Sequence, residues 1–311
     1  MNRSTQEWVD YFRWNGSVAM RVPWHIGPDL SDAERAAIAH SIQVFQLGEN
    51  SEGRHLMRYA KEWAERTGDA AYPEAIRMLI VEEQRHAGVL ARFMEINGIA
   101  RIKRGCTDGI FRRARNLLGS LEISISVLVT AEIIAKIYYP ALSEATASTV
   151  LQTICEQIHR EEIGHVEFQT EQLACIRAGR PAPGMWATRF LHRLLFYPTL
   201  MVVGLSHRMV LRRGDLSFWH FFARCHQEFV RDLAAMEPQS VPQLSRRPAS
   251  ETSATAIRAN SLLTRIGSET VDCADFARQT IQSNRLLPVV AFGIRRWGSK
   301  RISAVLSWCW K

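Results

Sequence analysis

The sequence lacks the marks of several protein classes. Its six cysteines are scattered over 311 residues without a Cys-x-x-Cys pair, which argues against a disulfide framework and against a zinc knuckle. The first ten residues are polar and lack the apolar core of a secretory signal. Its 18 glycines and 11 prolines are too few for a collagen-like or low-complexity chain. We therefore expect a globular cytoplasmic protein that keeps its thiols reduced.

Strand patterns and long apolar runs are also scarce. The uncharged stretch at residues 194–206 has only thirteen residues, too few to span a bilayer. Apolar residues instead recur at spacings of three and four, which predicts an all-α protein. Glycine and proline divide this pattern into expected helices at residues 31–68, 73–97, 109–145, 148–179, 186–213 and 217–236.

The helical pattern suggests four parts of the chain. Ser31 and Glu34 form a capping box at the start of the first long helix, so the preceding residues are expected to form an N-terminal arm. The first four long helices are enough for a four-helix bundle, and two more are expected to pack on it. The expected parts are an arm at 1–30, a bundle at 31–180, additional helices at 181–240, and a linker with a basic apolar tail at 241–311.

The basic charge is concentrated in the tail. Residues 1–240 contain 28 Lys/Arg and 27 Asp/Glu, whereas residues 241–311 contain 11 and 4. Residues 285–311 have no acid and place three tryptophans near arginine and lysine, a combination typical of a membrane interface. We expect a peripheral contact with the inner face of the membrane; docking of the tail on the body and a homodimer contact are the alternatives. No motif indicates nucleic-acid binding.

Each bundle helix carries polar residues in the middle of its apolar stripe. Four carboxylates and two imidazoles cannot stay ionised together in an apolar interior, because each uncompensated charge would cost several kcal/mol. A pair of metal ions resolves this, and ligands rich in oxygen with one nitrogen per metal favour iron or manganese over structural zinc. The residues are Glu49, Glu83, His86, Glu132, Glu162 and His165.

The Glu-x-x-His motif alone is a weak signal, because it occurs four times in the chain. Only the pairs at 83/86 and 162/165 lie on an apolar stripe, and each follows a helix with its own interior glutamate, 34 and 30 residues earlier. His55 and His159 flank the stripe, so we expect them to pack or to support the site. Glu52 is an additional ligand, a hydrogen-bond acceptor or the partner of an arginine such as Arg85.

Two points weigh against a simple metal-binding bundle. A metal-free network of buried ion pairs could use Arg54, Arg58, Arg85 and Arg160 as counter-charges, although these residues lie off the apolar stripes. The second point is the position of Glu49 and Glu83 relative to the turn between the first two expected helices. Glu49 lies farther from this turn than Glu83, by about 12 Å along the helix axis at 1.5 Å per residue. We expect the first helix to fray early, or the helices to cross at an angle.

The pattern Glu49, Glu83-x-x-His86, Glu132, Glu162-x-x-His165 resembles the ligand set of the ferritin-like di-iron carboxylate superfamily over residues 31–180. The resemblance implies that Glu83 and Glu162 bridge two irons and that the other four residues bind one iron each. Such sites bind dioxygen or peroxide in the diferrous state and oxidise a nearby substrate. The pattern is similar to that of rubrerythrins, but the rubredoxin-type Cys-x-x-Cys electron donor is missing.

These features predict an O2-dependent oxidoreductase with two iron ions, or a mixed Mn/Fe pair. It would hydroxylate, desaturate or N-oxygenate a substrate that is small and hydrophobic or bound to an acidic carrier protein. Its electrons would come from an external reductase or ferredoxin. The alternatives are iron handling or peroxide scavenging in the manner of ferritins and rubrerythrins, and a metal-free scaffold associated with a membrane.

Overall fold

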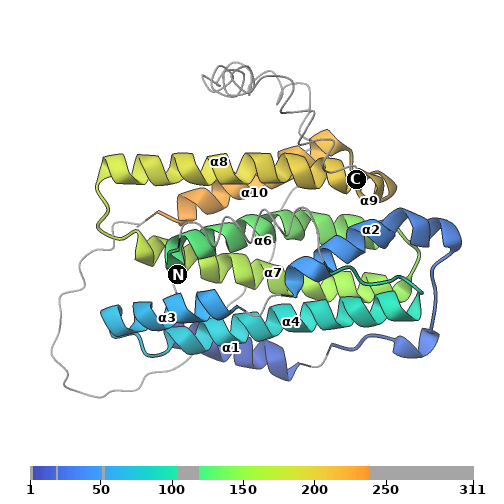
Figure 1. Ribbon diagram of the computed structural model, residues 1–311, viewed down its shortest axis with the longest axis horizontal. Helices are drawn as coiled ribbons and strands as arrows, with labels where there is room; N and C mark the ends of the chain where they lie inside the picture. Colours follow the sequence, from blue (N-terminus) through green and yellow to red (C-terminus); the bar gives the residue numbers. More distant parts are fainter. Residues whose placement is uncertain (1–2, 19, 51–52, 104–118, 238–311) are drawn as a thin grey trace, which may run out of the picture. The chain divides into compact units, whose positions relative to one another are not determined.

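The computed structural model describes residues 3–18, 20–50, 53–103 and 119–237 (Figure 1). These residues form helices joined by turns and loops, and no strand occurs among them. Within the same residues, no helix combines the length and the apolar character needed to cross a membrane. The prediction of an all-α protein is confirmed, whereas the tail at 241–311, with its expected membrane segment at 285–311, lies outside the described residues.

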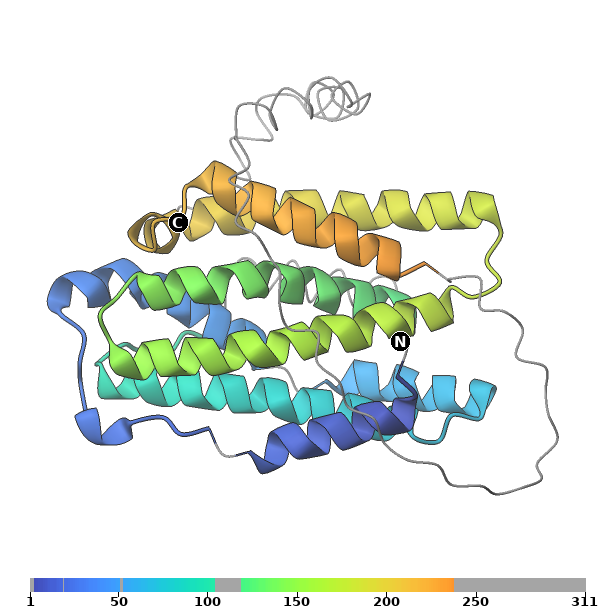
Figure 2. The same cartoon turned by 180° about the vertical axis from the view of Figure 1, so that it is seen from behind.

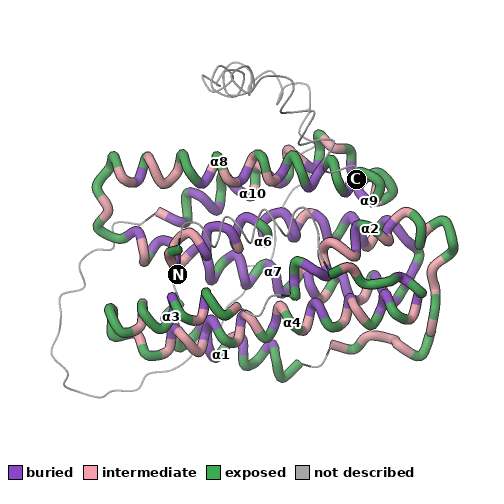
Figure 3. The backbone as a smooth tube through the Cα atoms, viewed as in Figure 1, coloured by how far each residue is buried: buried purple, intermediate pink, exposed green. Residues whose placement is uncertain are grey.

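Long helices run side by side through the centre of the molecule in both views (Figures 1 and 2). α7 starts after Ser148, whose hydroxyl accepts a hydrogen bond from the Leu151 amide, and the chain turns at Gly179 with a φ of 76°. α6 and α7 are buried along most of their length (Figure 3). The central elements are α2 (Asp32–Glu49), α3 (Arg54–Thr67), α4 (Tyr72–Ile96), α6 (Leu121–Glu144) and α7 (Thr149–Ile176).

The helix expected over residues 31–68 is two helices in the structure, so this prediction was wrong. α2 ends at Glu49 and α3 begins at Arg54. Gly53 has a φ of 63°, and a Cβ there would meet the Ile80 side chain at 2.3 Å, so only glycine fits this turn. The expected mismatch between Glu49 and Glu83 assumed one continuous helix. Because α2 ends at Glu49, that assumption no longer holds.

The N-terminal arm contains a helix of its own, α1 (Thr5–Ser17). Trp8, Val9 and Phe12 are buried, and the Phe12 ring packs edge-on against Phe168 of α7 with centroids 5.4 Å apart. Ser4 and Glu7 form a capping box at its start. This arm therefore closes one side of the core, which the sequence-based division into parts did not anticipate.

The additional helices pack on the α6 side. α8 (Ala182–Ser206) continues through Pro198 and is followed by α9 (Arg208–Arg213) and α10 (Phe218–Ala235). Phe196 of α8 stacks on Phe229 of α10 with ring centroids 3.9 Å apart. The single helix expected at 186–213 is thus interrupted at His207, where α9 turns away to contact α2 and α6.

Candidate metal centre

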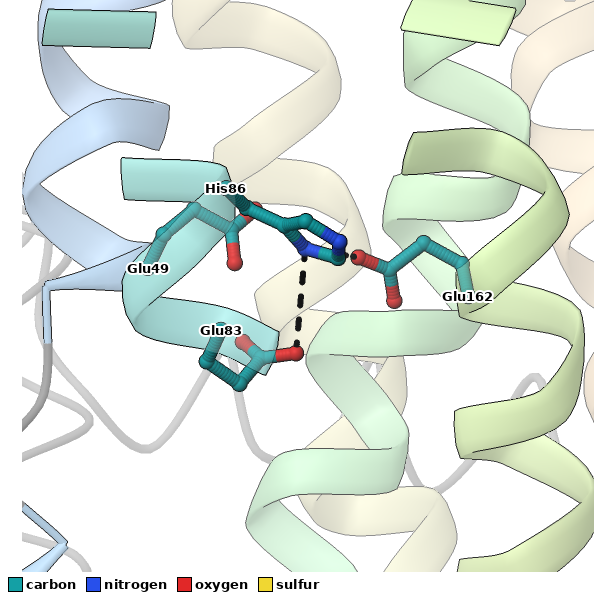
Figure 4. A group of neighbouring side chains, drawn as sticks. All are labelled: Glu49, Glu83, His86 and Glu162. Carbon is teal, nitrogen blue, oxygen red and sulfur yellow. Dashed lines mark ion pairs between the residues drawn. The ribbon is translucent and has the colours of Figure 1, made fainter. Parts of the chain in front are cut away.

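Six acidic and imidazole side chains from four helices meet in the interior. They are the six residues that the sequence singled out as metal ligands. Their ligand atoms form two groups, and within each group the atoms lie within 4.8 Å of one another. Such a cluster could bind a metal ion. One group is Glu49, Glu83, His86 and Glu162, shown in Figure 4, and the other is Glu83, Glu132, Glu162 and His165.

The Nδ1 atoms of His86 and His165 point at the carboxylates of the two glutamates that belong to both ligand groups. His165 Nδ1 lies 2.9 Å from Glu83 Oε1 and 3.6 Å from Glu162 Oε2. His86 Nδ1 lies 4.0 Å from Glu83 Oε1 and 3.5 Å from Glu162 Oε1 (Figure 4). Glu83 and Glu162 therefore stand between two imidazoles whose ring centroids are 5.6 Å apart.

Several of these polar atoms are buried and have no hydrogen-bond partner among the described residues. They are both Nδ1 atoms, Glu83 Oε1 and both carboxylate oxygens of Glu162. Unpaired buried polar atoms are rare in folded proteins, because each costs about 1–3 kcal/mol. Acceptor atoms gathered in this way fit a cation in each of the two ligand groups.

Two further glutamates fix the orientation of the histidines. Glu161 Oε2 lies 2.6 Å from His86 Nε2, and Glu82 Oε2 lies 3.0 Å from His165 Nε2. Each of these carboxylates therefore serves the imidazole of the other helix. A carboxylate on Nε2 holds the proton there and leaves Nδ1 free to bind a metal.

Arg85 joins these two glutamates on the outside of the cluster. Its Nη2 lies 2.7 Å from Glu82 Oε1 and 2.7 Å from Glu161 Oε1, and its Nη1 donates to the Asn15 carbonyl of α1. Arg85 thus neutralises the supporting carboxylates, and no ion pair links it to the six central residues among those described. It does not provide the counter-charge that a metal-free network would need.

Glu82 and Glu161 were missed in the sequence, although a signal was present. Each immediately precedes a central glutamate, so the motif on α4 and α7 is Glu-Glu-x-x-His. The doubled glutamate occurs at the two clustered motifs and not at Glu52 or Glu156. It therefore distinguishes the two motifs that meet in the cluster from the other two Glu-x-x-His pairs in the sequence.

The two remaining carboxylates are anchored by neutral side chains. The Tyr139 hydroxyl donates to Glu49 Oε1 at 2.5 Å, and Gln169 Nε2 donates to Glu132 Oε1 at 3.1 Å. Tyr139 is a buried aromatic residue of α6 that also contacts the cluster. These hydrogen bonds orient the carboxylates of Glu49 and Glu132 toward Glu83 and Glu162, which belong to both ligand groups.

Burial perturbs the acidity of the cluster. Desolvation and the neighbouring Glu83 carboxylate raise the pKa of Glu49 well above its usual range. Desolvation and the charge of Glu132 likewise raise the pKa values of Glu83 and Glu162. Desolvation also acts on Glu132, but contacts from Glu162 and His165 outweigh it and lower its pKa to about 2. Without a cation, several of these carboxylates retain protons that a metal would displace.

The flanking histidines, His55 and His159, are not part of the cluster. Glu52 lies outside the described residues. His55 is exposed and His159 is half-buried, and neither belongs to the two ligand groups found among the described residues. Burial lowers the pKa of His159.

A cavity of about 130 Å³ adjoins the cluster. Its wall includes Glu49, Glu83, Glu132 and Glu162 of the cluster, together with Thr199 and Val203 of α8 and with His207. The rest of the wall is mainly apolar and comes from α2 and α6. Its apolar side chains include Val44, Phe45, Val127, Leu128 and Ile134.

Loss of a supporting carboxylate should weaken metal binding without removing a ligand. We expect Glu161→Ala to lower metal affinity about 10- to 100-fold, because His86 Nε2 loses its acceptor while the number of ions bound per chain is unchanged. Competition with a chelator of known affinity measures this. Glu156→Ala, an exposed glutamate on the same helix, is the control, and equal affinities in the two variants would contradict the supporting role.

Comparison of the chain with protein-family models, with curated proteins and with solved structures finds no match.

Proposed function

We propose that the chain is a ferritin-like, non-haem di-iron oxidoreductase that uses dioxygen to oxidise a small hydrophobic organic substrate. The reaction would be a hydroxylation, desaturation or N-oxygenation, with electrons from an external reductase or ferredoxin. The observation that carries the proposal is a buried carboxylate and imidazole cluster in the wall of an apolar cavity.

The donor set fits two iron ions. Four carboxylates balance the charge of two divalent cations, and one imidazole per ion with several oxygens favours iron or manganese. Glu83 and Glu162 occur in both ligand groups, which supports assigning them as bridges. Glu49 and His86 would then complete the coordination of one ion, and Glu132 and His165 would complete that of the other.

The irons would supply the redox chemistry with dioxygen, and the chain supplies the rest. The supporting glutamates orient the two imidazoles, and Tyr139 and Gln169 orient the outer carboxylates. The apolar wall of the cavity limits water near the cluster. A substrate in the cavity would lie against the metal-facing carboxylates, since these form part of the same wall.

The cavity also indicates the kind of substrate. Its volume of about 130 Å³ is close to that of an apolar protein cavity of about 150 Å³ that holds benzene, so a single small ring or short chain fits. His207 adds one polar group: its Nδ1 lies 2.7 Å from Ser41 Oγ. Burial and nearby His40 lower the pKa of His207 to about 4, so it is a neutral hydrogen-bonding group.

This cavity favours an oxygenase over the alternatives. Iron storage and peroxide scavenging require no organic substrate and therefore no apolar chamber beside the metals. A metal-free scaffold would not need the unpaired ligand atoms.

The test is oxidation of small apolar candidates by the iron-loaded protein with dioxygen and a chemical reductant. We expect Val203→Phe to reduce product formation at least about tenfold, because a large ring in place of a cavity-lining valine overfills the chamber. Iron content and the optical change on exposure to oxygen should be unchanged. Products are quantified by mass spectrometry.

Val202→Phe is the matched control, because Val202 is the adjacent residue of α8 and is 38% exposed. Equal product formation by both variants would contradict the placement of the substrate. Iron-loaded wild-type protein that consumes oxygen but oxidises none of the candidates would count against the oxygenase and for iron handling.

A further inference from the structure

The outer face of α8 is apolar and uncovered within the described residues. Large hydrophobic side chains recur there every three to four residues or at twice that interval, so they form one stripe along α8. Their exposed fractions range from 36% to 67%. The stripe, called the outer stripe below, consists of Trp186, Phe190, Leu194, Met201 and Leu205.

The opposite face of the same helix is the one that packs on the body. Phe196 and Leu200 are fully buried, and Val203 lines the cavity. The side chains of the outer stripe therefore do not belong to the hydrophobic core of the described residues. Soluble monomers rarely expose a contiguous apolar stripe of this length, which covers about 30 Å of helix at 1.5 Å per residue.

The charged residues of α8 and α9 themselves are all of one sign. Residues 182–214 contain five arginines and no acid. Arg189 pairs with Glu237, but no acidic side chain among the described residues pairs with Arg193, Arg208 or Arg212. Arg193 lies near the start of the stripe, and the other two lie near its end.

We infer that the outer stripe docks on an anionic lipid surface, with α8 lying in the plane of the interface. An apolar face bordered by arginine is the arrangement of interfacial helices, since the side chains enter the acyl boundary while the arginines meet lipid phosphates. Trp186 in the stripe and Trp219 at the start of α10 are 67% and 72% exposed, as suits the headgroup region. α8 lies on the surface and does not cross it.

Charge argues against two other partners for the outer stripe, a second copy of the chain and the chain's own residues 241–311. In a dimer through α8, parallel or antiparallel, arginines at the ends of one stripe would meet arginines of the second copy. The chain's own residues 241–311 carry a net charge of +7 and would be repelled by the same arginines. An anionic membrane attracts both the outer stripe and this segment.

The test uses the full-length chain and vesicles of phosphatidylcholine alone or mixed equally with phosphatidylglycerol. We expect sedimentation with the anionic vesicles only, weakened by 0.5 M NaCl. Leu194→Glu/Leu205→Glu should reduce binding at least about tenfold, because two charges enter the apolar face. This result is independent of iron content, which is measured in parallel.

Trp14→Glu/Val18→Glu is the matched control: Trp14 is exposed on α1 and Val18 is exposed at the C-cap of that helix, and α1 lies on the side of the molecule away from α8 (Figures 1 and 2). It should bind as the wild type does. Equal binding of the α8 variant would overturn the inference and assign any membrane binding to another segment. A wild-type dimer that ignores vesicles and becomes monomeric in the α8 variant would overturn it in favour of self-association.

Discussion

Glu162→Ala should reduce bound iron to less than about a tenth of the wild-type amount while leaving the helical content unchanged. Glu162 is fully buried, belongs to both ligand groups, and has two carboxylate oxygens without a hydrogen-bond partner among the described residues. Its removal takes a ligand from both ions and leaves three carboxylates against four positive charges. Metal analysis after loading with ferrous iron, together with circular dichroism, measures both quantities.

Glu156→Ala gives a close control, because Glu156 also stands three residues before a histidine on α7 but is exposed. It should load iron as the wild type does. Full iron content in Glu162→Ala would refute the ligand assignment, and so would equal losses in the two variants.

Glu162→Gln should have opposite effects on the metal-free and the iron-loaded protein. Burial and the charge of Glu132 hold the pKa of Glu162 well above its usual range. Near neutral pH the metal-free fold must therefore bind a proton there or bury an unpaired charge, and either lowers stability. The neutral amide should stabilise the metal-free protein by about 1–3 kcal/mol.

The sign of the pH dependence follows from the raised pKa. Because the folded carboxyl binds its proton more tightly than the unfolded one, it destabilises the fold above the ordinary pKa of a glutamate and loses that effect as the pH falls below it. The advantage of Glu162→Gln should therefore be larger at pH 8 than at pH 5.

Iron should reverse the order of stability. Saturating a wild-type site at a thousand times its dissociation constant adds about 4 kcal/mol, or roughly 8–16 °C in Tm for a domain of this size. Glu162→Gln should lose most of this gain. Melting curves in the presence of a chelator and in the presence of ferrous iron test this reversal in the order of stability. Glu156→Gln is the control. A metal-free Glu162→Gln protein that is less stable than the metal-free wild type would contradict the prediction.

The polar middle of each apolar stripe was the most informative feature of the sequence. A charged residue at a core position is unfavourable unless it is compensated, so the six residues could be selected without coordinates, and the structure places all six together. Periodicity also located α4 and α7 to within a few residues. These features depend on residue spacing within a helix, which the sequence states directly.

Features that depend on contacts between elements were harder to predict. The turn after Glu49 carries an Asn-Ser-Glu-Gly signal, but the apolar stripe resumes in α3 and hid the break. α1 has its own capping box at Ser4 and Glu7, but a capping box does not show which element the helix packs against. The crossed pairing of Glu82 and Glu161 requires two helices to be placed together.

The bare face of α8 shows a further limit of sequence patterns. The helix is apolar on both faces, so hydropathy identifies a packed helix without saying which face is covered. The structure buries Phe196 and Leu200 and leaves Leu194 and Leu205 59% and 53% exposed.

The central claim is that the six clustered residues hold two iron ions. The most direct measurement is an anaerobic titration of the metal-free chain with ferrous iron, with bound and free metal separated and counted. Two tightly bound ions per chain, lost together in Glu162→Ala, are the predicted result. Binding of no iron, or of a single ion at saturation, would contradict the claim.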